Sequence, residues 1–94
     1  MQTNENIKET EKLDKNKVFT IIVNTREKTW NEKDISYEQV IVLAFGSYSD
    51  DKNTVYTVTY SRGPESHHEG SLVKGAIVKV KNGMVFNVTQ TNKS

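Results

Sequence analysis

The chain has 94 residues, a length typical of one domain, and 13 basic and 12 acidic side chains are interspersed along it. Because the charges nearly balance, the chain lacks the excess of basic residues that is typical of a nucleic-acid-binding protein. No apolar run reaches the roughly 20 residues that a membrane span needs. The chain contains no cysteine, which excludes disulfides and thiolate chemistry and, with no signal-peptide pattern, favours a cytoplasmic location.

Residues 1–16, "MQTNENIKETEKLDKN", contain only Ile7 and Leu13 as large apolar residues. We therefore predict a disordered N-terminal tail, followed by one domain over residues 17–94. The alternative is a tail that docks on a partner.

The first predicted element is a strand over residues 17–24, rich in β-branched and aromatic side chains. Its residues Phe19, Ile21 and Val23 share one face. The sequence "NTRE" then predicts a turn, and residues 27–31 form the second strand of a hairpin with Trp30 as its large apolar residue.

A helix is predicted from Ser36 to Phe45. Ser36 and Gln39 have the spacing of a capping box, and Gly46 follows the last turn as a helix stop. Ile35 and Val40 have the spacing of a hydrophobic staple. The residues expected to face the core are Tyr37, Val40, Leu43 and Ala44.

Three more strands are predicted, over residues 54–60, 76–81 and 84–89, with an Asn82–Gly83 turn before the last. Residues 61–70 are expected to be a polar loop and residues 71–75 a connector. We expect the last strand to end near Thr89 and residues 90–94 to form an exposed, extended tail. The predicted core is Phe19, Ile21, Val23, Val40, Leu43, Tyr56, Val58, Val78, Val80, Met84, Phe86 and Val88.

The element order is strand, strand, helix, strand, strand, strand, so two hairpins flank one helix. One apolar helix face and one apolar face per strand favour an α+β fold in which the helix packs across one face of a single mixed sheet. This is the β-grasp, or ubiquitin-like, architecture. It places the final strand in the middle of the sheet, beside the first, with its end leaving the fold.

No catalytic or metal site is predicted, and no cofactor is expected. Neighbouring side chains such as His67 and His68 rarely bind one ion, and the chain lacks the further histidine or cysteine that a zinc site needs. Asp50 and Asp51 are acidic but lack the ligand spacing of a calcium loop. The sequence therefore favours a binding or carrier module over an enzyme.

The face opposite the helix is a candidate partner-binding surface. Small apolar groups and threonines on three adjacent predicted strands would form it, and the rival interpretation is an ordinary half-exposed sheet. The candidate residues are Thr20, Ile22, Thr57, Thr59, Val85, Asn87 and Thr89.

Several stretches of residues 17–94 together resemble the bacterial multiubiquitin family of ubiquitin-like domains. They are "VN" at the end of the first strand, "ISYEQV" at the start of the helix, "VTYSRG" in the third strand and "VKVKNGMVFNVT" near the C-terminus.

The resemblance implies a protein modifier encoded beside its enzymes, in clusters whose relatives act in defence against phages. The implied partners are a ubiquitin-activating-like enzyme, a conjugating-like enzyme and a deconjugating or processing protease. The implied conjugation end is Thr91, Asn92, Lys93 and Ser94.

Three alternatives follow from a C-terminus that lacks the Gly-Gly of eukaryotic relatives. Ser94 is itself the reacting residue, a protease first trims the tail, or the domain is not conjugated. In the last case it is a non-covalent module, with self-assembly into a homo-oligomer as one form. A sulfur carrier shares the fold, but it needs the Gly-Gly end.

Overall fold

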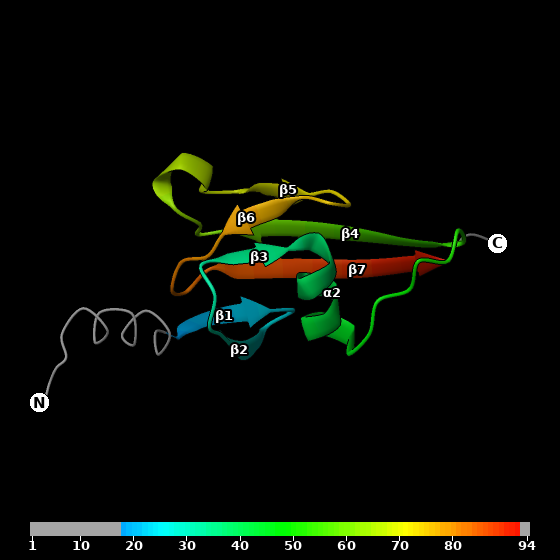
Figure 1. The fold of residues 1–94 in the computed structure, drawn as a ribbon, viewed down its shortest axis with the longest axis horizontal. Coiled ribbons are helices and arrows are strands. Elements are labelled where there is room, and N and C mark those ends of the chain that lie inside the picture. The colour runs from blue at the N-terminus through cyan, green and yellow to red at the C-terminus, as the bar shows by residue number, and fades with distance from the viewer. Residues whose placement is uncertain (1–17, 93–94) are drawn as a thin grey trace, which may run out of the picture.

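A computed structural model of the chain describes residues 18–92 (Figure 1). The predicted tail over residues 1–16 lies outside the described residues. In chain order, the elements are β1 (Phe19–Val23), β2 (Arg26–Trp30), β3 (Asp34–Ser36), α2 (Tyr37–Phe45), β4 (Thr54–Ser61), the 3-10 helix η1 (Glu65–His67), β5 (Gly70–Leu72), β6 (Ile77–Lys79) and β7 (Val85–Asn92).

Five strands form one mixed sheet in the order β2-β1-β7-β4-β5. β1 and β7 are parallel, and the other neighbours in this sheet are antiparallel. The final strand thus lies in the middle, beside the first, as the sequence predicts. α2 packs against β1, β4 and β7, and Figure 1 shows it crossing the sheet. The expected α+β, β-grasp-type fold is confirmed.

The pairing predicted for the strand over residues 76–81 is wrong. That strand shortens to β6, which pairs with β3 in a separate two-stranded sheet and not with β7. Ile35 lies opposite Val78 in this pair, and both side chains are buried. The prediction of a second hairpin fails because Ile35, expected to act only as a helix staple, provides a strand for β6. β5 also forms where a loop and connector were expected.

The helix begins and ends as the sequence predicts. The backbone N–H of Gln39 donates to Ser36 Oγ at 3.1 Å, and the backbone N–H of Ser36 donates to Gln39 Oε1 at 2.9 Å. These two bonds complete the capping box. Gly46 ends the helix with φ at +87°, in the left-handed region that glycine enters without a steric penalty.

The core keeps most of its predicted members and gains four that the sequence does not predict. They are Ile35, Ile41, Tyr60 and Leu72, and Tyr37 is buried on the helix face where it is expected. Phe19, Leu43 and Tyr56 are only partly buried and pack against the core from its margin. The helix face is therefore rotated from the prediction, because Ile41 and not Leu43 joins Val40 in full burial.

Candidate functional site

The C-terminal half of β7 forms a two-stranded ribbon with the start of β4. Gln90, Thr91 and Asn92 lie opposite Tyr56, Val55 and Thr54. β1 pairs with β7 only at Val85 and Phe86, so it does not reach this part of the strand. Figure 1 shows β7 running to the end of the molecule beside β4. We call residues 54–57 and 89–92 the C-terminal ribbon.

The ribbon corrects the expectation of a strand that ends near Thr89. Residues 90–92 remain in β7 and are paired with β4, although their side chains are exposed as expected. Alternating β-formers such as Thr89 and Thr91 continue the ladder after the last buried residue, Val88. Lys93 and Ser94 lie outside the described residues.

The side chain of Asn24 ends the pairing of β1 with β7. Its Nδ2 donates to the Val88 carbonyl at 3.1 Å, and its Oδ1 accepts from the Val88 amide at 2.8 Å. The side-chain amide of Asn24 therefore makes the two hydrogen bonds to Val88 that the backbone of a neighbouring strand would otherwise make. Because backbone groups alternate in direction along a strand, the N–H and C=O groups of Gln90 and Asn92 face the same side as those of Val88. No strand covers that edge in residues 18–92.

Asn24 also forms the tight turn between β1 and β2. Asn24 and Thr25 have φ values of +51° and +69°, and positive φ at both central residues is the requirement of a type I′ hairpin turn. Asparagine tolerates this conformation, whereas β-branched threonine is strained in it. The backbone of Asn24 thus aims its side chain at β7.

We predict that Asn24→Ala destabilises the domain by about 2–3 kcal/mol, measured by urea unfolding. Alanine loses two hydrogen bonds and is strained at positive φ. The matched control is Asn24→Gly, which removes the same bonds but accepts the backbone conformation. It should lose about 1 kcal/mol less. Equal stability of Asn24→Ala and the wild-type protein would contradict a structural role for the Val88 contacts.

An aromatic cluster joins the ribbon to the end of the helix. Tyr56 of β4 stacks on Tyr48 with ring centroids 5.5 Å apart, and it also contacts Phe45, the last residue of α2. The Ser49 amide donates to the Tyr56 hydroxyl at 3.0 Å. These contacts hold the loop between α2 and β4 against the ribbon at Tyr56.

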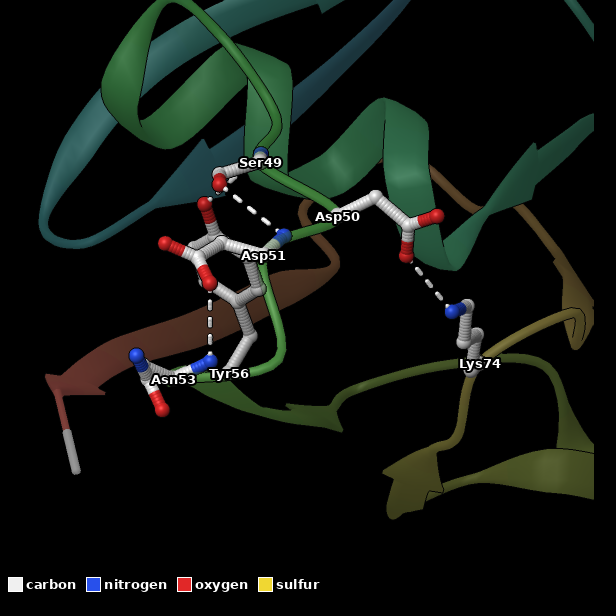
Figure 2. A network of polar contacts seen from close by, with 6 residues as sticks. All are labelled: Ser49, Asp50, Asp51, Asn53, Tyr56 and Lys74. Atoms are coloured by element: carbon white, nitrogen blue, oxygen red, sulfur yellow. Dashed lines mark hydrogen bonds and ion pairs between the residues drawn. The ribbon is translucent and has the colours of Figure 1, made fainter.

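The two aspartates of this loop have structural partners (Figure 2). Asp51 Oδ1 accepts from the Asn53 amide at 3.0 Å, and Asp50 Oδ1 lies 2.7 Å from Lys74 Nζ. Its hydrogen bond to Lys74 lowers the pKa of Asp50, and the same contact raises the pKa of Lys74. Both groups are exposed to solvent, so the pair contributes little to stability.

The predicted partner-binding residues lie on one face of three adjacent strands. The register places Thr57 opposite Thr89 and Thr59 opposite Asn87, and Ile22 of β1 lies beside Val85. Their side chains are exposed or half-buried, because the alternate residues of the same strands turn toward α2. Across β1, β7 and β4 this face bears no charged side chain. Its binding role stays a prediction.

Within residues 18–92, no group of three or more histidine, cysteine, aspartate or glutamate side chains is placed to hold a metal ion. His67 lies in η1, and His68 follows it in an exposed loop. No helix in this part of the chain is long and apolar enough to cross a membrane.

Comparison with protein families matches a multiubiquitin model to residues 19–92. The chain belongs to the multiubiquitin family. The matched range begins with β1 and ends with the last residue of β7, so it includes the whole C-terminal ribbon. No curated protein matches the chain, and no solved structure matches it. The family assignment therefore defines a ubiquitin-like domain without assigning a target or an enzyme.

Sequence reasoning missed Asn24, which controls where the open edge of the ribbon begins. Its signal was the "NTRE" turn, since asparagine is favoured where φ is positive. The partner of its side chain, Val88, is 64 residues away and becomes visible only in the fold.

Proposed function

We propose that this multiubiquitin domain is a bacterial protein modifier, activated at its C-terminal carboxylate and joined to amines of target proteins. The supporting observation is the position of β7. As the central strand it is held by β1 and β4, and its last residues leave the sheet body as an exposed ribbon that ends two residues before Ser94. A rigid domain thereby presents its C-terminal end to an enzyme.

The chemistry proceeds in three balanced steps. The carboxylate attacks the α-phosphate of ATP and releases pyrophosphate, which gives an acyl adenylate. A thiol or hydroxyl of a partner enzyme displaces AMP and forms a thioester or ester. A target amine then displaces the enzyme and forms an amide. In this sequence the reacting carboxylate is that of Ser94, unless a protease first exposes an upstream residue.

In this scheme the domain is the substrate of other proteins and is not itself an enzyme. Its partners are an activating-like enzyme, a conjugating-like enzyme and a deconjugating or processing protease, all in the cytoplasm, in a pathway that serves antiphage defence. It requires no cofactor of its own and no contact with nucleic acid or membrane.

The test combines the domain with the activating-like enzyme encoded nearest to it and measures ATP–pyrophosphate exchange. We expect exchange with the free carboxylate and none with the C-terminal amide, because an amide cannot attack ATP. The control is circular dichroism, which should be identical for the two forms. Exchange by the amidated domain would contradict the assignment of Ser94 and indicate trimming upstream.

The uncharged face of β1, β7 and β4 favours a second candidate, a non-covalent interaction module. Exposed threonine and valine side chains can pack against a partner or a second copy without leaving a charge buried. This candidate becomes the better one if neither the 94-residue chain nor any trimmed form supports exchange.

A further inference from the structure

β2 is an edge strand of the main sheet, and no strand within residues 18–92 pairs with its outer edge. Val23 and Arg26 close the two-residue turn, so Arg26, Lys28 and Trp30 direct their backbone groups toward β1. The N–H and C=O groups of Glu27 and Thr29 consequently point away from the sheet. Neither residue has a hydrogen-bond partner on that side within residues 18–92. Such an edge accepts an added strand.

An apolar groove runs beside this edge. It has a volume of about 220 Å³ and lies between Trp30 of β2 and the residues Glu38, Gln39, Val42 and Leu43 of α2. Val42 is 43% exposed there, although it belongs to the helix that packs on the sheet. The Trp30 Nε1 donates to the Asp34 carbonyl at 2.8 Å, which fixes the indole as one wall. The groove is therefore formed before any ligand binds.

The charges around the groove indicate the chemistry of the occupant. Alternation along β2 places Arg26 and Lys28 on the same strand face as Trp30. Neither cation forms an ion pair within residues 18–92, where Lys74 and Asp50 make the only one. Glu38 is the groove's acid and lies on the helix side. Acidic side chains of a ligand would thus find unpaired cations along the strand side.

We propose that the edge of β2 and its groove bind an extended peptide that has alternating apolar residues flanked by acidic ones. The peptide adds a sixth strand beside β2, with backbone bonds to Glu27 and Thr29. Its apolar side chains enter the groove between Trp30 and Val42, and its acids lie near Arg26 and Lys28. This contact is non-covalent and separate from the C-terminal ribbon.

The test uses the fluorescence of Trp30, the only tryptophan in the chain. The probe is a capped peptide with four alternating valine and alanine residues between two pairs of aspartates. We expect a saturable change in fluorescence with half-saturation below about 1 mM. One control peptide has lysines in place of the aspartates, and another has a central proline, which cannot complete a strand ladder. Both should bind at least about tenfold more weakly.

Three variants locate the site. Val42→Glu fills the groove with a charge at an exposed position, and Thr29→Pro removes an outward N–H while keeping the bonds to β1. Each should weaken binding by at least about tenfold without changing the circular dichroism spectrum. The double variant Arg26→Glu/Lys28→Glu should prefer the lysine peptide, because the two charges beside the groove change from positive to negative.

Absence of a saturable change with the aspartate peptide would overturn the proposal, as would equal binding of the proline peptide. Sedimentation of the wild-type protein and of Val42→Glu tests the other occupant, a second copy. A dimer that Val42→Glu disrupts, in a protein that does not bind the peptide, would assign the groove to self-association.

Discussion

Ile41→Ala is expected to destabilise the domain by about 2–5 kcal/mol, because truncation of a fully buried isoleucine leaves a cavity between α2 and the sheet. The matched comparison is Leu43→Ala, two residues along the same helix. Leu43 lies at the margin of the core, where water or neighbouring side chains fill part of the space, so its loss should be about half as large. Urea unfolding measures both.

The comparison separates the two possible orientations of the helix. A protein of this size is stable by only about 5–15 kcal/mol, so Ile41→Val, with a loss of about 0.5–1.5 kcal/mol, provides a variant that stays folded. If Leu43→Ala costs more than Ile41→Ala, the helix presents the face that its sequence periodicity predicts, and the observed packing of α2 is wrong.

The sequence is most informative where local chemistry determines local structure. Ser36 and Gln39 are close in sequence, and their capping box forms as predicted, with Gly46 ending the same helix. Alternation is equally local, which explains why Phe86 and Val88 are correctly assigned to the core. The place of β7 beside β1 follows from the number and order of the apolar elements.

The errors concern residues whose environment depends on distant partners. Ile35 satisfies the pattern of a helix staple, but its pairing with Val78 is a long-range contact that no local pattern encodes. β3 and β5 have three residues each, too few for an alternation pattern to identify. The orientation of the helix shifts because both Ile41 and Leu43 fit an apolar stripe, and packing against the sheet selects Ile41.

The end of β7 shows the same limit at the candidate site. A tail without apolar side chains cannot be buried, and Gln90, Thr91 and Asn92 are indeed exposed. An exposed side chain does not leave its backbone unpaired, however, because the hydrogen bonds between two strands need only the N–H and C=O groups of each. Tyr56, Val55 and Thr54 of β4 provide that strand. Lys93 and Ser94 follow this ribbon in the sequence.

This ribbon leads to a prediction about activation. If Ser94 is the reacting residue, as proposed, and the enzyme's channel accepts only a single extended chain, residues 90–92 must separate from β4 before that carboxylate can react. The outer pair, Thr54 and Asn92, should open first, because Asn92 is the last paired residue and its Oδ1 lies 3.5 Å from Thr54 Oγ1. The inner pair should open later, because Val88 lies opposite Val58 and its backbone amide also donates to the side chain of Asn24.

We predict that a disulfide across the ribbon blocks activation. The chain has no cysteine, so Thr54→Cys/Asn92→Cys introduces one defined pair. Thr54 and Asn92 form a pair without mutual backbone bonds, in which the Cβ atoms lie about 4.5–5.5 Å apart, close to the distance that a disulfide spans. On oxidation, ATP–pyrophosphate exchange with the activating-like enzyme should fall by more than about tenfold, and reduction should restore it.

The control must separate the crosslink from the added bulk. Capping both thiols of the same variant as methyl disulfides adds similar atoms near the C-terminus but leaves the strands free to part, so this form should be activated like the reduced one. Equal exchange by the oxidised and reduced forms would show that the enzyme accepts the paired ribbon and that strand separation is unnecessary. If neither the reduced variant nor the wild-type protein supports ATP–pyrophosphate exchange, the proposed activation itself is contradicted, because neither form contains the disulfide.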